Sequence, residues 1–257
     1  FYITTQMYYT EILQQLLNAG CKEEQISGYD IIFQLQWEEN CMDYYKQHET
    51  QVEWLYENLA DEASRKVLEN RLLFLRTRNR KHMTGVRRKH QYFEEELVDF
   101  SKIGCYVDLG MYTGDTIMEF LKVTGGRDKT IYGFEPDTEI FQMAQNNLGH
   151  CSNITFVPFA TSDYDGVAKV EQSLGVMQTI ADGIFSSNAE GSNAFQVCRL
   201  DTYFDGKPIK IDMIKMDIEG AEHATLSGAK EIIESDHPVL AVCVYHKQED
   251  ILELPRL

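Results

Sequence analysis

The distribution of apolar residues along the chain changes near residue 100. Before that point apolar side chains recur at helical spacing, as at Leu68, Leu72 and Leu75, and Gly20 is typical of a helix end. We predict helices at residues 12–17, from 29 to about 59, and from 61 to about 78. Residues 1–99 therefore form a helical N-terminal region in which we expect no strands.

After residue 100, short apolar runs alternate with helical segments. The predicted strands are CYVDL (105–109), TIYGFE (130–135), ITFVPFA (154–160), MIKMDI (213–218) and VLAVCVY (239–245). Strands that are apolar along their whole length and alternate with helices predict a parallel sheet covered on both faces. Residues 100–257 are thus a doubly wound α/β domain, in which 161–199 form loops with one or two short strands.

Composition and charge narrow the class of protein. The chain has 257 residues, 43% of them hydrophobic, and a formal net charge of -17. Such acidity argues against a protein that covers nucleic acid or lies on an anionic membrane. No apolar run approaches the roughly 20 residues of a membrane span, and the start shows no export signal. The six cysteines form no CxxC pair, so we expect reduced core thiols and a cytoplasmic protein.

The stretch DLGMYTGDT follows the first predicted strand and fits neither common phosphate-binding motif. It lacks the second glycine of G-x-G-x-x-G and the Gly-Lys-Ser/Thr ending of a P-loop, and Asp108 would repel a phosphate. An amino-acid ligand fits better. Its ammonium would face Asp108, and its carboxylate would meet backbone amides where a helix begins near Asp115. S-adenosylmethionine (AdoMet) is such a ligand, and an ordinary glycine-rich turn is the alternative.

The end of the next strand carries an acid suited to a nucleoside ribose. Glu135 lies about 20 residues beyond the glycine turn, where dinucleotide-binding folds place the acid that accepts hydrogen bonds from ribose hydroxyls. Pro136 ends the strand, and Asp137 can cap the following helix. Both AdoMet and a nicotinamide dinucleotide would use Glu135, so only the first turn separates them.

The last two strand ends supply candidates for acid–base chemistry. His246 follows the strand VLAVCVY, and an imidazole suits removal of a hydroxyl proton near neutral pH. Asp217 could orient that histidine, bind the acceptor or be the base itself. Acids at Glu219 and Glu222 could merely stabilise a helix start. Asp217, Glu219 and His246 could instead hold a divalent metal, but their spacing matches no closed ligand pattern, so no metal site is predicted. Lys215 shares a strand face with Asp217, so we expect an internal ion pair.

Together DLGMYTGDT, IYGFEPD, IKMDIEGAEHATLSGAK and LAVCVYHKQEDILELP closely resemble the FkbM family of AdoMet-dependent methyltransferases. The resemblance covers roughly residues 100–257, and QYF at 91–93 resembles a segment that precedes this domain in some members. It implies a Rossmann-like methyltransferase sheet and methyl transfer to a hydroxyl of a sugar or polyketide. It places the methionine part of AdoMet at Asp108, Gly110 and Gly114, the ribose at Glu135 and the adenine beside Ala160. Ser186 and Ser187 resemble a serine-rich step to which we assign no role.

The chain departs from the family pattern in two ways. Met111 and Tyr112 stand where Ala and Asn are common, which should narrow the space beside the methionine tail. Family members also continue into a last strand pair, so we expect the domain to be C-terminally incomplete at Leu257.

The predicted site divides into a catalytic set and a cofactor-binding set. The catalytic residues are His246, Asp217 and Glu219. The cofactor-binding residues are Asp108, Gly110, Tyr112, Thr113, Gly114, Asp115, Glu135, Pro136, Asp137, Ala160 and Asp217.

A basic stripe between residues 65 and 90 bears on the acceptor. It contains ten Lys and Arg side chains against Glu69 alone: Arg65, Lys66, Arg71, Arg76, Arg78, Arg80, Lys81, Arg87, Arg88 and Lys89. A solvated face, an anionic sugar nucleotide or glycan, and RNA are the alternatives, in decreasing order. We predict an O-methyltransferase acting on a carbohydrate or related metabolite, with a nicotinamide-dependent oxidoreductase or a non-catalytic nucleotide-binding module as alternatives.

Overall fold

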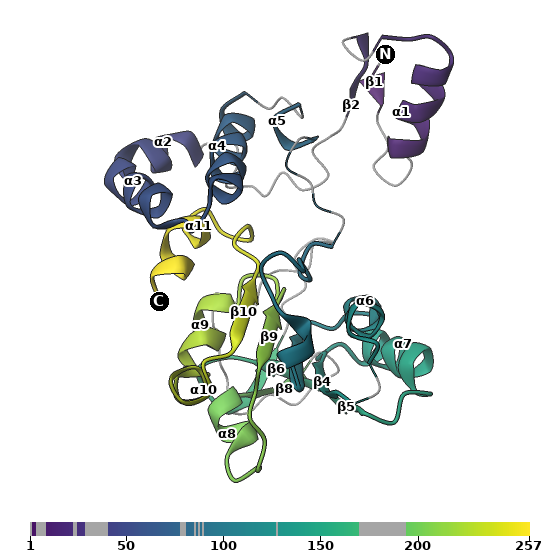
Figure 1. Cartoon of the computed structure of the whole chain (residues 1–257), viewed down its shortest axis with the longest axis vertical. Coiled ribbons are helices and arrows are strands. Elements are labelled where there is room, and N and C mark those ends of the chain that lie inside the picture. Colours follow the sequence, from purple (N-terminus) through teal and green to yellow (C-terminus); the bar gives the residue numbers. More distant parts are fainter. Residues whose placement is uncertain are drawn as a thin grey trace. The chain divides into compact units, whose positions relative to one another are not determined.

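A computed structural model of the chain describes residues 2–3, 9–22, 25–28, 41–77, 81–84, 86, 88, 90–126, 128–169 and 194–257. The chain divides into two compact units, Phe1–Arg88 and Lys89–Leu257 (Figure 1). Each unit is described by itself below. The boundary predicted from the sequence, between residues 99 and 100, stays a prediction.

The first unit is built mainly of helices. They are α1 (Tyr9–Asn18), α2 (Cys41–Gln47), α3 (Glu49–Asn58), α4 (Glu62–Thr77) and α5 (Lys81–Thr84). The described part of the helix predicted from residue 29 is interrupted at His48, whose backbone is not helical, and residues 29–40 lie outside the described residues. A parallel pairing of two short strands, β1 (Tyr2–Ile3) and β2 (Ser27–Gly28), was not expected from the sequence.

The second unit is organised around a five-stranded parallel sheet of order β10-β9-β3-β4-β5 (Figure 1). Its strands are β3 (Cys105–Leu109), β4 (Thr130–Phe134), β5 (Ile154–Val157), β9 (Met213–Met216) and β10 (Val239–Val242). The chain runs from β3 outward through β4 and β5, then returns to the other side of β3 for β9 and β10. This order confirms the predicted doubly wound sheet, and its topological switch point lies between β3 and β9.

Two apolar clusters show that both faces of the sheet are covered. Tyr106 of β3 packs in one cluster with Ile117 and Phe120 of α6 (Asp115–Thr124), which also contains residues of α7 (Thr138–Leu148). The next strand residue, Val107, packs in the other cluster with Leu226 of α9 (Glu222–Ser227), which also contains residues of α10 (Lys230–Asp236). Successive strand residues therefore face opposite layers, which explains why the strands are apolar throughout.

A smaller mixed sheet follows β5. It contains β6 (Phe159–Thr161), β7 (Gly166–Lys169) and β8 (Ala194–Cys198) in the order β6-β8-β7. The run ITFVPFA, predicted as one strand, is divided at Pro158, which has no backbone N–H to give to a ladder. The two short strands expected between residues 161 and 199 are present as β7 and β8. Ser186 and Ser187 lie outside the described residues.

Short elements complete the unit: η3 (Phe100–Lys102), α8 (Leu200–Phe204), α11 (Asp250–Glu253) and η4 (Leu254–Arg256). All six cysteines are free thiols, and Cys105 and Cys243 are buried as the apolar runs around them predicted. Among the described residues, no helix has the length and apolar character that crossing a membrane requires.

Candidate functional site

The turn after β3 is held at the switch point by backbone contacts on two sides. The amides of Gly110 and Met111 both donate to the carbonyl oxygen of Phe134 at the end of β4, each at 3.0 Å. On the other side, a Cβ atom added to Gly110 would lie 2.1 Å from the carbonyl oxygen of Asp217. Gly110 also has φ +73°, a conformation that side chains disfavour. Glycine at this position therefore permits the close approach of the turn to the end of β9.

Asp108 and Lys215 form a buried ion pair beneath this turn. They are directly opposite in the pairing of β3 with β9, and Lys215 Nζ lies 3.0 Å from Asp108 Oδ1. Lys215 Nζ also donates to the carbonyl oxygen of Gly110 at 2.7 Å. The ion pair expected for Lys215 is present, but its partner comes from the neighbouring strand and not from Asp217. Asp108 thus has a cationic partner without any ligand, and its contact with a ligand ammonium stays a prediction.

Met111 and Tyr112 point in different directions. The Met111 side chain is fully buried in the cluster that contains Ile117 and Phe120, so the expectation that it narrows the ligand space was wrong. At this turn position the sequence does not show which way the side chain points. Tyr112 has φ +49° and is 56% exposed.

The rest of the turn connects β3 to α6. Thr113 accepts a hydrogen bond on its carbonyl oxygen from Asn147 Nδ2 of α7, at 2.9 Å. Gly114 is the left-handed residue before α6, where a Cβ would lie 2.3 Å from a methyl carbon of Leu148. Asp115 is the first residue of α6. The turn is thereby fixed against α7 as well as against the two strands.

The acid after β4 is buried and oriented by its own turn. Glu135 Oε1 accepts from the amide of Asp137 at 3.0 Å, and burial raises the pKa of the Glu135 carboxyl. Asp137 caps α7 by accepting from the amides of Glu139 and Ile140, as expected. Pro136 lies between these two acids. Farther along the chain, Ala160 is buried in β6.

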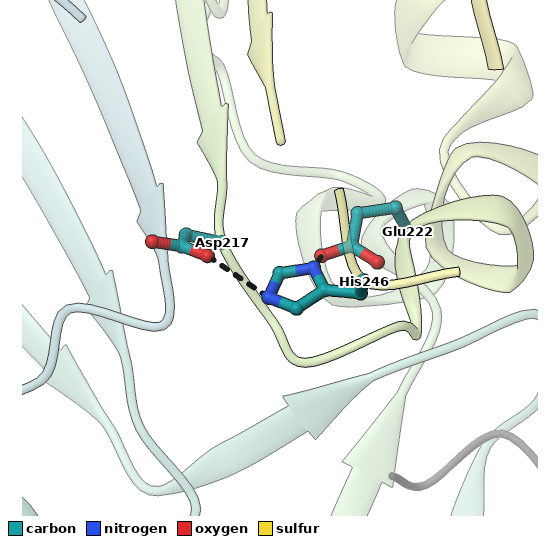
Figure 2. Close-up of side chains that lie close together, drawn as sticks. All are labelled: Asp217, Glu222 and His246. Carbon is teal, nitrogen blue, oxygen red and sulfur yellow. Dashed lines mark ion pairs between the residues drawn. The ribbon is translucent and has the colours of Figure 1, made fainter. Parts of the chain in front are cut away.

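His246 lies between carboxylates that face its two ring nitrogens (Figure 2). Nδ1 is 2.9 Å from Glu222 Oε1, and Nε2 is 3.4 Å from Asp217 Oδ1 and 3.6 Å from Glu219 Oε2. Burial disfavours the charged imidazolium, but Glu222 and then Glu219 and Asp217 outweigh it and raise the pKa of His246. The arrangement stabilises a proton on this ring.

Glu222 is the part of this cluster that sequence reasoning missed. It is the first residue of α9, is fully buried, and accepts from the amide of Ile218 at 3.0 Å while it faces His246. An acid at the first helical position is ordinarily explained by the helix dipole, so only the fold reveals its second partner.

Both oxygens of the Asp217 carboxylate accept a tyrosine hydroxyl. Tyr92 donates to Oδ2 at 2.9 Å, and Tyr245 donates to Oδ1 at 3.0 Å. The Tyr92 hydroxyl also lies 3.3 Å from Cys243 Sγ. Asp217 is therefore held in one orientation at the edge of the sheet.

Asp217, Glu222 and His246 offer ligand atoms that lie within 4.8 Å of one another, the separation at which a shared metal ion is conceivable. The two carboxylates, however, face opposite nitrogens of one imidazole. A single ion binds only one imidazole nitrogen, so both carboxylates could not reach it in this arrangement. The geometry fits a clamped imidazole better than a coordination shell.

A sequence model of the FkbM methyltransferase domain matches residues 108–255, which include the turn after β3 and all the strand ends described above. The chain belongs to the FkbM methyltransferase family. The solved structure of methyltransferase FkbM from Methylobacillus flagellatus KT is similar, with a TM-score of 0.72 and 23% sequence identity. The match covers 95% of this chain and 63% of that one, and identity at this level supports the fold alone. No protein of curated function matches the chain.

The FkbM domain does not contain every residue of the cluster. Asp217, Glu222 and His246 lie within residues 108–255, whereas Tyr92 precedes them. A segment outside the matched domain thus contributes a side chain to the same edge of the sheet.

Proposed function

We propose that this FkbM-family chain is a cytoplasmic AdoMet-dependent O-methyltransferase that methylates a hydroxyl of a carbohydrate or related metabolite. The supporting observation is the meeting of Gly110, Glu135, Asp217 and His246 at the carboxyl ends of β3, β4, β9 and β10, at the switch point of a doubly wound sheet. Ligands of such sheets bind at this edge.

The charges at this edge favour AdoMet over a dinucleotide. Lys215 is the cation nearest the turn, and it is already paired with Asp108. Glu135, Asp217 and Glu219 add negative charge, which suits a ligand with an ammonium and a sulfonium and disfavours a pyrophosphate. The residues present therefore fit AdoMet, which supplies a methyl group already activated for transfer.

The proposed cofactor contacts divide between two turns. Asp108, Gly110, Tyr112, Thr113, Gly114 and Asp115 would hold the methionine part, while Glu135, Pro136 and Asp137 would hold the ribose. Ala160 is assigned to the adenine and Asp217 to the border between cofactor and acceptor. Because Asp108 is fully buried, its charge would act on the ammonium mainly through the orientation of Lys215 and the Gly110 carbonyl oxygen.

His246 is proposed as the base that takes the acceptor proton. Glu222 fixes the ring through Nδ1, which leaves Nε2 directed toward Asp217 and Glu219. These carboxylates stabilise the imidazolium that proton transfer forms. Asp217 would orient the ring, and Glu219, whose side chain is 63% exposed, would meet an acceptor hydroxyl.

An anionic acceptor would need cations that this edge does not supply among its described residues. The basic stripe belongs to the first unit, and Arg78, Arg80, Arg87 and Lys89 lie outside the described residues. Arg65 has a structural role, since it donates to the carbonyl oxygens of Tyr56 and Leu59. Recruitment of an anionic glycan or sugar nucleotide by the rest of the stripe stays a prediction, which steep weakening of binding by salt would support.

Calorimetry with AdoMet and with NAD, followed by incubation with methyl-labelled AdoMet and a panel of glycans and sugar nucleotides, tests the proposal. We expect AdoMet binding and label transfer to a hydroxyl. Tight binding of NAD without AdoMet binding would favour the oxidoreductase alternative. AdoMet binding without transfer to any acceptor would favour a binding module.

A further inference from the structure

The segment that precedes the family domain reaches the candidate catalytic cluster through one side chain. Tyr92 lies 125 positions before Asp217 in the sequence, yet its hydroxyl donates to Asp217 Oδ2 at 2.9 Å. Both residues belong to the unit Lys89–Leu257. The contact is therefore internal to one compact unit.

The backbone around Asp217 is already fixed, so its side chain is the part that needs support. The Asp217 amide donates to the carbonyl oxygen of Leu109, and its own carbonyl oxygen lies against Gly110. The carboxylate is partly exposed, with 27% of the side chain accessible. Without donors, a carboxylate at such a position samples several rotamers.

The two tyrosines hold different oxygens of this carboxylate. Tyr245 binds Oδ1, the same oxygen that faces His246 Nε2, and Tyr92 binds Oδ2 on the other side. Tyr92 is thereby the donor that prevents rotation of the group away from the imidazole. Its ring is itself held by an edge contact with Phe93 and by Lys215 Nζ, which lies 5.6 Å from the ring centroid.

We propose that Tyr92 is a positioning residue of the methyl-transfer site, whose hydroxyl fixes the Asp217 carboxylate against His246. The catalytic meaning of this contact rests on the proposed function, but the contact itself can be tested without turnover. The groups that face His246 are Glu222 of α9, Glu219 and Asp217 after β9, and the neighbouring ring of Tyr245. Asp250 of α11 acts on Glu222 from behind.

The test is an NMR titration of the His246 ring in the wild-type chain and in Tyr92→Phe, with the signal assigned from His246→Gln. The phenylalanine keeps the ring packing and removes only the hydroxyl. We expect the His246 titration midpoint to fall by about half a pH unit as the carboxylate turns away. Tyr203→Phe is the matched control, because Tyr203 packs in the aromatic group of Tyr132, Phe134 and Phe204, and its midpoint should equal that of the wild type.

An unchanged midpoint in a folded Tyr92→Phe chain would overturn the proposal. So would a higher midpoint, which would mean that the carboxylate stays in place and loses only a donor. Circular dichroism establishes folding, and Tyr92→Trp serves as a second variant without the hydroxyl if phenylalanine unfolds the chain. AdoMet calorimetry on the wild-type chain separates the two hypotheses: failure to bind AdoMet removes the proposed function and leaves the titration result intact.

Discussion

Lys215 Nζ and Asp108 Oδ1 lie 3.0 Å apart in the centre of the sheet, with 2% and 0% of their side chains exposed. Removal of one partner leaves the other charge buried and unpaired. We therefore expect Lys215→Met to lower the free energy of unfolding by about 3 to 5 kcal/mol in urea denaturation. Lys230→Met is the control, since Lys230 pairs with Glu234 at the surface with 72% of its side chain exposed. The Lys230 variant should be nearly neutral.

The double variant Lys215→Met/Asp108→Asn sharpens this test. It removes both charges, so it should recover part of the stability that Lys215→Met loses. A double variant no more stable than the single one would contradict the ion-pair explanation.

Gly110 and Gly206 allow backbone strain to be separated from steric contact. Their φ angles are +73° and +70°, but a Cβ on Gly110 would lie 2.1 Å from the Asp217 carbonyl oxygen, whereas a Cβ on Gly206 would meet nothing within 4 Å. We expect Gly206→Ala to lower the free energy of unfolding by about 1 kcal/mol and Gly110→Ala by at least about 2 kcal/mol more. Equal losses in thermal unfolding would show that β9 can move away from the turn.

Glu135 should determine the affinity for AdoMet. A glutamine keeps the bond from the Asp137 amide but accepts fewer ribose hydroxyls, so we expect Glu135→Gln to weaken AdoMet binding by roughly 10- to 100-fold in calorimetry. Glu139→Gln, in the first turn of α7, makes the same chemical change outside the proposed site. Unchanged affinity in Glu135→Gln would exclude Glu135 as the ribose acid.

His246 should affect turnover without affecting cofactor affinity. With an acceptor from the label-transfer panel, we expect His246→Ala to lower kcat by about 100- to 10,000-fold and to leave the AdoMet dissociation constant nearly intact. His223→Ala, at an exposed position of α9, is the matched control. Full turnover in the His246 variant would exclude this histidine as the base.

Asp250 should make stability depend on pH. Burial is the main cause that raises its pKa from 3.8 to about 6, so the folded chain binds this proton more tightly than the unfolded chain. The stabilisation from this group is complete below about pH 4 and is lost as pH rises toward 6. We expect Asp250→Asn to gain about 2 kcal/mol relative to the wild type between pH 4 and pH 7, after allowance for solvent screening. Parallel stability curves from urea denaturation at each pH would contradict this assignment.

The sequence predicted the parts of the site that depend on order along the chain. Alternation of strand and helix places Glu135, Asp217 and His246 at strand ends, and all three lie where a parallel sheet brings such ends together. The partner of Lys215 could not be predicted, because it depends on which strands are neighbours.

Other features depend on contacts between distant segments. Nothing local shows that Met111 enters the core or that Tyr92 reaches Asp217, since both depend on how the chain packs after the sheet forms. The contact between Glu222 and His246 joins α9 to the end of β10 and is likewise a property of the fold.

The turn after β3 is bound by the Phe134 carbonyl oxygen on one side and closely packed against the Asp217 carbonyl oxygen on the other. Its backbone is thus preorganised, and little conformational entropy remains to be lost when a ligand arrives. Tight association at this edge would consequently need no large rearrangement of the sheet. It would instead be as sensitive to the folding stability of the strands as to the contacts of the ligand itself.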